Sequence, residues 1–283
     1  MARTIAARLS GFCLAMICLF NTPARSADQM PLFDAHLHYN QPAWQAFDPP
    51  YVEEIFDQAG VSGALVTSTP DDGTLTLFKA NPKRFLPELC PYRGEINAGN
   101  WTHDPGVVDY IKERLPKAPY AGIGEIHIYR VSEVDWGVVG KVAAIARENK
   151  LFLHVHSESP AIERLFALEP EVTIIWAHAG FYDKPGTIGR MLDKYDNLHA
   201  ELSLRAPNIH PPGDDIDPDW KAVLLRHQNR FVVGSDTYIN LAWAEYDEII
   251  ADHRAWLAKL PRDVAKKIAH ENAEKLFGKS ARD

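Results

Sequence analysis

The stretch Phe33-Asp34-Ala35-His36-Leu37-His38 is a short apolar segment that ends in two histidines one residue apart. In a β-strand, side chains two residues apart point to the same face. His36 and His38 would therefore project together, and neutral imidazoles are good ligands for divalent metals such as zinc. A His-x-His pair also occurs on ordinary strands, so its meaning depends on the rest of the chain.

Short apolar segments alternate with amphipathic segments of helical length from residue 31 onward. The amphipathic segments repeat their apolar residues at helical spacing, as Val138, Val142 and Ile145 do. The pattern predicts helices that include residues 52–59, 138–149, 241–260 and 262–277. It predicts strands at residues 32–36, 61–66, 84–90, 120–128, 151–156, 172–178, 198–204 and 231–235.

Eight strands that alternate with helices over roughly 250 residues indicate a (β/α)8 TIM barrel. A doubly wound open sheet also alternates, but more often carries a glycine-rich phosphate turn after its first strand, where this chain has Leu37-His38-Tyr39-Asn40. Hydrophobic residues make up 46% of the chain and charged residues 24%, which permits one full core. We expect a single domain over residues 28–283.

Residues 1–27 have the features of a secretory signal peptide. Arg3 and Arg8 precede a short apolar segment, and Ala24-Arg25-Ser26 offers small residues to a signal peptidase. The alternative is an uncleaved membrane anchor, for which the apolar segment is short. We therefore expect a periplasmic or secreted protein with no membrane partner after cleavage.

Cleavage would change both the charge and the cysteine count. It removes three arginines and no acid, so the net charge moves from -8 to -11. Nucleic-acid binding depends on neutralising phosphates, so a chain this acidic is a poor partner for nucleic acid. Cys90 is the one cysteine beyond the signal, which excludes an internal disulfide, and its apolar surroundings predict burial.

Residue types that bind metals recur at the carboxyl ends of the predicted strands, where barrel active sites lie. Each of them could be a hydrogen-bonded core residue if taken alone. Burying several without a partner ion would be costly, so together they indicate a metal site. They are His36, His38, Glu125, His127, His154, His156, His178 and Asp236.

The motifs that contain these residues resemble those of the amidohydrolase superfamily, close to its amidohydrolase-related metal-dependent hydrolases with a barrel fold. Gly122-Ile123-Gly124-Glu125-Ile126 also resembles the fourth-strand motif of TatD-type metal-dependent hydrolases, in which the glutamate is a metal ligand. The other matching pieces occur in the family's order: Asp34-Ala35-His36-Leu37-His38, Leu153-His154-Val155-His156-Ser157, Trp176-Ala177-His178-Ala179-Gly180, Gly234-Ser235-Asp236 and His270-Glu271-Asn272-Ala273-Glu274-Lys275-Leu276-Phe277.

The resemblance implies a role for each strand-end residue. His36, His38 and His156 would be metal ligands. His154 would be the second choice for the fifth-strand ligand and would otherwise contact the substrate. Glu125 would bridge two ions if two are bound, so one or two ions per chain remain open, with zinc as the expected metal.

The same resemblance implies the catalytic groups. Asp236 would touch the metal and take a proton from its bound water, and His178 would be a ligand or would stabilise the developing oxyanion. His127 would face the substrate or orient a ligand through its ring N–H.

The loops beyond the strand ends would select the substrate. Arg93 and Arg205 are candidates to hold a substrate carboxylate or phosphate. Tyr39, Trp44 and Phe47 would either line the pocket or pack beneath the loop that carries them. Residues 206–219, rich in proline and aspartate, could form a lid.

The sequence thus predicts an enzyme that uses a metal-activated water to cleave an amide, lactone or ester bond of a small molecule. One alternative is a non-oxidative decarboxylase, because part of the resembling family removes CO2 with the same metal shell. Another is a non-catalytic binding protein on a barrel scaffold. Helices around a barrel also offer surfaces for a homo-oligomer.

Overall fold

The structure is a computed structural model that describes residues 30–213 and 215–278. The predicted signal peptide lies outside these residues. Among the helices in the described part of the chain, none is long and apolar enough to cross a membrane.

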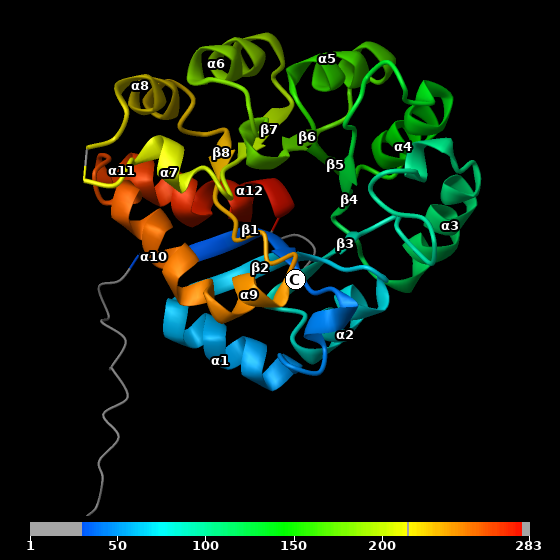
Figure 1. Cartoon of the computed structure of the whole chain (residues 1–283), viewed down its shortest axis with the longest axis horizontal. Helices are drawn as coiled ribbons and strands as arrows, with labels where there is room; N and C mark the ends of the chain where they lie inside the picture. The colour runs from blue at the N-terminus through cyan, green and yellow to red at the C-terminus, as the bar shows by residue number, and fades with distance from the viewer. Residues whose placement is uncertain (1–29, 214, 279–283) are drawn as a thin grey trace, which may run out of the picture.

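Eight parallel strands follow one another around the molecule in sequence order (Figure 1). The ends of this sheet meet, because Ala35 N donates to Val233 O at 2.8 Å and Asp236 N donates to His36 O at 2.7 Å. The (β/α)8 barrel prediction is confirmed. The strands are β1 (Leu32–His38), β2 (Val61–Thr67), β3 (Phe85–Leu89), β4 (Gly122–His127), β5 (Phe152–His156), β6 (Ile174–Trp176), β7 (Leu198–Glu201) and β8 (Phe231–Val232).

Helices surround the strands on the outside of the barrel (Figure 1). They cover the outer face of the sheet, which is why every residue of β1 is buried. The helices are α1 (Pro49–Ala59), α2 (Asp72–Ala80), α3 (Gly106–Arg114), α4 (Trp136–Glu148), α5 (Ser159–Leu168), α6 (Pro185–Lys194), α7 (Ala206–Ile209), α8 (Pro218–Arg226), α9 (Asn240–Ala244), α10 (Tyr246–Leu257), α11 (Arg262–Lys266) and α12 (Asn272–Phe277).

Local sequence explains where these helices begin and end. Asp48 caps α1 by accepting a hydrogen bond from Tyr51 N, and Pro49 at the first position has a φ suited to a helix. Gly60 ends the helix with a left-handed φ of 69°, a conformation that glycine adopts at little cost. In α4, Val138, Val142 and Ile145 are buried, as their spacing predicted.

Two predicted helices are divided in the structure. Residues 241–260 form α9 and α10, because Glu245 leaves helical geometry between them. Residues 262–277 contain a π-helical turn, Lys267–Glu271, between α11 and α12. The predicted loop 206–219 begins as α7 and ends inside α8.

The strands β6, β7 and β8 end earlier than predicted. His178, Leu204 and Asp236 have left-handed φ values of 55°, 60° and 55°. Such φ values are uncommon for residues other than glycine and cluster at functional sites. The chain leaves the sheet before these residues, which therefore sit on turns at the mouth of the barrel.

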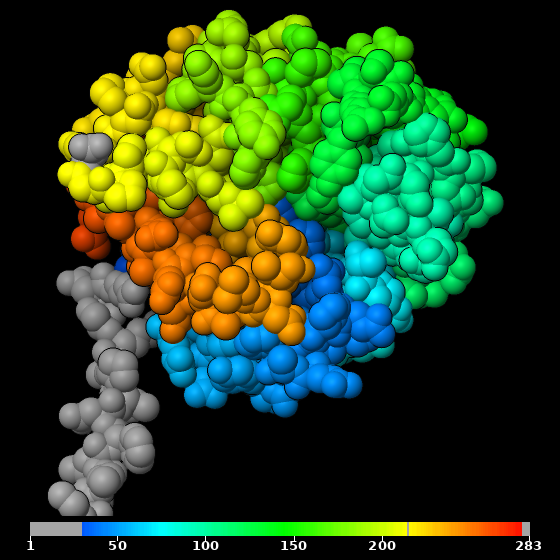
Figure 2. All heavy atoms as spheres, viewed as in Figure 1, coloured from blue at the N-terminus to red at the C-terminus, as the bar shows by residue number. Residues whose placement is uncertain are grey.

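Closure of the barrel brings the first and last parts of the described chain next to each other. In the space-filling view, the blue N-terminal segments and the orange segments after β8 are in contact on one face (Figure 2). Residues far apart in sequence can therefore contribute to one site on this face.

Candidate active site

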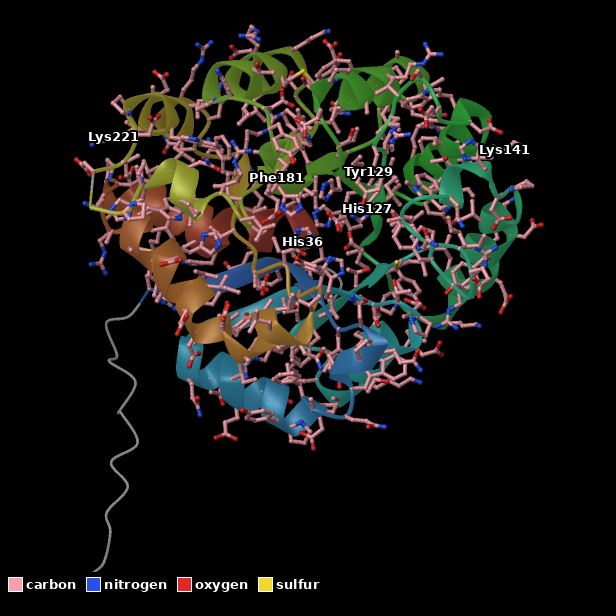
Figure 3. The ribbon with its side chains drawn as sticks, in the orientation of Figure 1. His36, His127, Tyr129, Lys141, Phe181 and Lys221 are labelled. Carbon is pink, nitrogen blue, oxygen red and sulfur yellow. The ribbon has the colours of Figure 1, made fainter. Side chains whose placement is uncertain are left out.

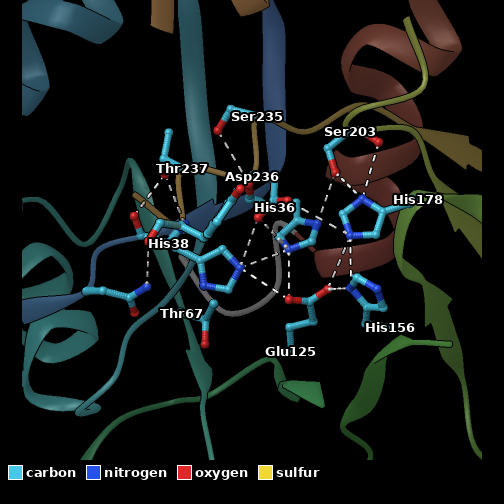
Figure 4. A network of polar contacts seen from close by, with 12 residues as sticks. His36, His38, Thr67, Glu125, His156, His178, Ser203, Ser235, Asp236 and Thr237 are labelled. Atoms are coloured by element: carbon cyan, nitrogen blue, oxygen red, sulfur yellow. Dashed lines mark hydrogen bonds and ion pairs between the residues drawn. The ribbon is translucent and has the colours of Figure 1, made fainter. Parts of the chain in front are cut away.

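Glu125, at the carboxyl end of β4, lies between two groups of histidines (Figure 4). Its Oε2 is 3.5 Å from His36 Nε2 and 3.3 Å from His38 Nε2. Its Oε1 is 3.0 Å from His156 Nδ1 and 3.4 Å from His178 Nε2. Each oxygen of this buried carboxylate thus faces a different pair of imidazoles, and Oε2 also faces His127 Nε2 at 3.5 Å, an arrangement suited to bridging two cations.

Asp236 lies on the β1 side of this centre. Its Oδ1 is 3.3 Å from His38 Nε2 and 3.7 Å from His36 Nε2. Burial by itself would raise the pKa of Asp236, but His36 and His38 outweigh that effect and lower it. The carboxylate is therefore ionised at neutral pH and can accept a proton.

The donor set fits a divalent metal. His36 Nε2 and His38 Nε2 lie only 3.1 Å apart and face the same carboxylates, as ligands of one ion do. Two sets of three residues could each hold an ion, because the three ligand atoms of each set lie within 4.8 Å of one another. Glu125 belongs to both sets. One set is completed by His36 and His38, and the other by His156 and His178. Imidazole nitrogen and carboxylate oxygen suit zinc and several other divalent ions.

Glu201, on β7, was not predicted from the sequence, although the structure makes it central. It is fully buried, with Oε2 2.9 Å from His36 Nδ1 and 3.2 Å from the backbone nitrogen of His178. Holding His36 Nδ1 turns His36 Nε2 toward Glu125, and such support of a ligand histidine is typical of metal sites. An acid inside a predicted buried strand was the available sequence signal.

Tyr92 is a second residue that sequence reasoning missed. Its hydroxyl accepts a hydrogen bond from His127 N at 2.8 Å and lies 2.9 Å from His127 Nδ1. Burial lowers the pKa of His127 to about 4, so this imidazole is neutral. With Nδ1 bonded to the phenol, His127 Nε2 faces Glu125 Oε2 at 3.5 Å.

His154 lies beneath the centre rather than in it. It is completely buried, with Nδ1 3.3 Å from Glu88 Oε2 and its ring packed edge-on against His36 at 4.4 Å. It belongs to none of the ligand sets found among the described residues, whereas His156 does. The expected contact of His154 with substrate is therefore corrected, because β5 turns this side chain into the barrel interior.

Arg205 does not reach the pocket either. Its Nη1 donates to Gly180 O at 2.8 Å, and its Nη2 donates to Asp183 O at 2.9 Å. The guanidinium also lies over the Trp220 ring at 4.8 Å. The prediction that Arg205 holds a substrate carboxylate or phosphate is therefore corrected. Its guanidinium donates instead to backbone carbonyls of the loop after β6.

Arg93, the other predicted clamp, also has partners of its own. Its Nη2 donates to Asp104 Oδ2 at 2.8 Å, and its guanidinium lies 4.7 Å from the Tyr110 ring. It is not among the residues that line the pocket over Glu125. The structure therefore does not bring it to the candidate site.

We expect Arg205→Ala to destabilise the fold by on the order of 3 kcal/mol, because buried carbonyls lose charged donors. Chemical denaturation of the variant and the parent measures this difference. Arg226→Ala is the matched control: Arg226 is exposed and pairs with Asp193, so its loss should cost less than about 1 kcal/mol. Equal stability of the two variants would contradict the structural role of Arg205.

The aromatic residues after β1 pack beneath their loop, which was one of the two predicted outcomes. Tyr39 and Phe47 are buried, and Tyr39 OH donates to Phe47 O at 2.8 Å. Trp44 Nε1 donates to Tyr39 O at 2.8 Å. They hold the loop in place and do not form a wall of the pocket.

A pocket of about 380 Å³ opens above the carboxylates and histidines. Its floor includes His38, Glu125, His156 and Asp236. Cys90 also lines it, and burial raises the pKa of this thiol to about 12, so it is not a thiolate nucleophile. A larger hollow of about 720 Å³ lies at the amino ends of β4 and β5, but it contains none of these ligand sets. The smaller pocket is the candidate active site, as the barrel fold favours.

Figure 3 shows the position of the site in the whole molecule. His36 and His127 lie near the middle of the barrel, with Tyr129 and Phe181 beside them. Lys141 and Lys221 lie at the periphery. Histidines and aromatic rings therefore lie at the carboxyl ends of the strands, whereas these two lysines lie far from them.

Known proteins with this fold include enzymes. The 4-oxalomesaconate hydratase of Rhodopseudomonas palustris is 10% identical, with a TM-score of 0.58 over 87% of this chain and 95% of that chain. An Agrobacterium tumefaciens protein is 17% identical, with a TM-score of 0.58 over 88% and 94%. L-hydantoinase from Arthrobacter aurescens is 13% identical, with a TM-score of 0.54 over 87% and 70%. At these identities the likeness shows the fold alone.

The family assignment comes from the sequence itself. No curated protein matches the chain. The family model described as amidohydrolase matches residues 33–279. This range includes all eight strands apart from Leu32, the first residue of β1, and every residue of the two ligand sets. The chain therefore belongs to the amidohydrolase family and is an enzyme.

Proposed function

We propose that this enzyme is a metal-dependent hydrolase that cleaves an amide, lactone or ester bond of a small molecule. The observation that carries the proposal is the Glu125 carboxylate between two histidine pairs, with Asp236 ionised beside one of them. Hydrolysis needs an activated water and a base at hydrogen-bond distance, and this arrangement offers a place for both.

The residues present would hold one or two divalent ions, which we propose to be zinc. His36, His38 and Asp236 would hold one ion, His156 and His178 the other, and Glu125 would contact both. Bound there, the metal would acidify a water molecule and polarise the bond to be cleaved. A shared Glu125 is the role that the resemblance of residues 122–126 to the TatD-type motif implies.

The chain's own groups would then move the proton. Asp236 would take it from the attacking water and deliver it to the leaving group. His178 Nδ1 lies 2.9 Å from Ser203 Oγ, which leaves Nε2 directed toward Glu125. That orientation supports the role of metal ligand, the first of the two roles expected for His178.

The pocket favours hydrolysis over decarboxylation. A decarboxylase needs a cation over the substrate carboxylate, but no lysine or arginine is among the described residues that line the pocket. Arg93 and Arg205, the predicted candidates, are bonded elsewhere. The presence of a complete set of candidate metal ligands together with a candidate base, Asp236, also argues against a non-catalytic binding protein.

Metal content and turnover test the proposed function together. Protein purified without chelator should contain about two equivalents of divalent metal and should cleave members of a panel of simple esters, lactones and amides. Removal of the metal by a chelator should abolish turnover, and zinc or manganese should restore it. Turnover that persists at full rate in metal-free protein would refute the proposal.

Metal binding should release protons. In metal-free protein, burial alone would lower the pKa of His38, but hydrogen bonds to Asp236 and Glu125 outweigh it and raise the pKa to about 9. The pKa of His36 is also raised, because Glu125, Asp236 and Glu201 outweigh its burial. A metal takes the neutral imidazole, so protons must leave and affinity must rise with pH up to about 9.

Calorimetry measures this linkage. Zinc titrations at pH 7 in buffers of different ionisation enthalpy should give a release of at least about one proton per ion. A titration without proton release would show that these histidines are already neutral.

We also propose that residues 1–27 direct export and are then removed. The basic start, apolar segment and small residues near position 26 support this proposal. Amino-terminal sequencing of protein recovered from the periplasm or medium tests it. Recovery of the intact chain in the cytoplasm would contradict it.

A further inference from the structure

Several large hydrophobic side chains are exposed around the mouth of the candidate active site. We call five of them the apolar rim: Tyr129 after β4, Phe181 and Tyr182 after β6, Leu204 after β7 and Tyr238 after β8. Their exposed fractions run from 38% for Phe181 to 81% for Tyr182. A cluster of this kind on a water-facing surface usually marks a place where something apolar binds.

The apolar rim is continuous with the pocket. Tyr129, Leu204 and Tyr238 line the pocket together with Glu125 and Asp236. The Tyr129 ring lies 5.9 Å from the His156 ring. These three side chains therefore border the space through which a molecule reaches the carboxylates.

The rest of the apolar rim reaches the site through Phe181, which contacts His178. The Phe181 ring lies edge-on to His178 at 5.9 Å, and Tyr182 packs against Phe181 at 5.0 Å. Figure 3 shows Phe181 and Tyr129 on the same face, near His36 and His127. The aromatic side chains thus extend outward from the site itself.

Leu204, at the mouth of the barrel, has an unfavourable backbone conformation. Its φ of 60° is left-handed, which costs a non-glycine residue roughly 1–2 kcal/mol. Its side chain is nevertheless 45% exposed, so the fold does not recover that cost by burying it. Backbone strain of this kind clusters at functional sites, and the exposed Leu204 side chain offers an apolar surface to a ligand there.

The residues that line the pocket disfavour an anionic group on the part of the ligand that lies away from the histidines. Among the described residues lining the pocket, the acids Glu125 and Asp236 are present but no lysine or arginine. A neighbouring hollow shares His127 and Tyr129 and contains Arg130, whose Nη1 is bonded to Glu133 at 3.1 Å. A carboxylate or phosphate lying in this pocket would thus meet no lysine or arginine among the residues that line it.

We infer that the enzyme acts on uncharged substrates that carry an apolar chain or ring, which lies on the apolar rim while the reacting bond lies over Glu125 and Asp236. This inference rests on the proposed function, because it assigns the substrate class of the same site. Each methylene buried on binding would add affinity, and a charged end would lose it.

Three hydroxamic acids test the inference by equilibrium binding to the metal-loaded enzyme. Acetohydroxamate lacks a chain, octanohydroxamate carries one, and suberic acid monohydroxamate has the same length but ends in a carboxylate. Calorimetry should show octanohydroxamate binding at least about tenfold more tightly than either of the others, since each buried methylene contributes about 0.8 kcal/mol.

Two variants assign the preference to the apolar rim. Leu204→Asn should reduce the preference for octanohydroxamate over acetohydroxamate by about threefold or more, and asparagine tolerates the left-handed φ. Leu168→Asn is the matched control, because Leu168 is exposed on α5 away from this pocket. It should leave the preference unchanged.

Each result decides one claim. Equal affinities of the hydroxamates, or no binding of any of them, would overturn the inference even if esters are cleaved. The apolar rim would then be a docking surface for a macromolecule. Chain-dependent binding without turnover of any ester, lactone or amide would uphold the inference and refute the hydrolase proposal.

Discussion

Replacing Glu125 by glutamine should remove at least about one equivalent of metal and lower turnover by on the order of 10³-fold. Each oxygen of Glu125 faces a different pair of histidines, at 3.0–3.5 Å. Glutamine keeps the shape but loses the charge, and its amide nitrogen cannot serve as a ligand. One histidine pair would therefore lose its shared ligand.

Metal analysis after dialysis and turnover of the best panel substrate measure this effect. Glu171→Gln is the control, because Glu171 is exposed at the opposite end of the barrel. Circular dichroism would show that both variants fold. Wild-type metal content with full activity in Glu125→Gln would contradict a bridging role and would leave Glu125 as a supporting residue.

Replacing Asp236 by asparagine should lower kcat by about 10²- to 10⁴-fold, the usual contribution of a general base. Asparagine cannot accept the proton from the attacking water. His36, His38 and Glu125 remain as ligands, so the metal content should fall much less than in Glu125→Gln. Asparagine also tolerates the left-handed φ of 55° at this position, so the fold should persist.

Steady-state kinetics and metal analysis on the same preparation separate these effects. Asp252→Asn, an exposed change on α10, is the control and should leave both quantities unchanged. If Asp236→Asn loses its metal as fully as Glu125→Gln, then Asp236 acts chiefly as a ligand. If kcat is unchanged, another group takes the proton.

The sequence by itself predicted the architecture and most of the residues that meet at the candidate site. Alternating apolar and amphipathic segments specify strands and helices through local periodicity, so the barrel could be predicted without coordinates. The spacing of His36 and His38 put two imidazoles on one face, because strand side chains repeat every two residues. Parallel strands then brought Glu125, His156, His178 and Asp236 to the same end of the barrel.

Tertiary structure alone decided which side chains support these groups. Glu201 Oε2 meets His36 Nδ1 across 165 positions of sequence, and Tyr92 meets His127 across 35. Local periodicity carries no information about such pairs. It also did not predict that loop carbonyls would accept hydrogen bonds from Arg205, or that β7 and β8 would be shorter than their apolar segments.

The physical reason is the closure of the barrel. A strand's pattern fixes which of its residues face inward, but the distance between two inward residues depends on the register of all the strands between them. That register is set by packing and hydrogen bonds throughout the sheet, such as the bond from Asp236 N to His36 O. The type of site could therefore be predicted from the sequence. The hydrogen-bond network of the site and its apolar rim depend on the folded chain.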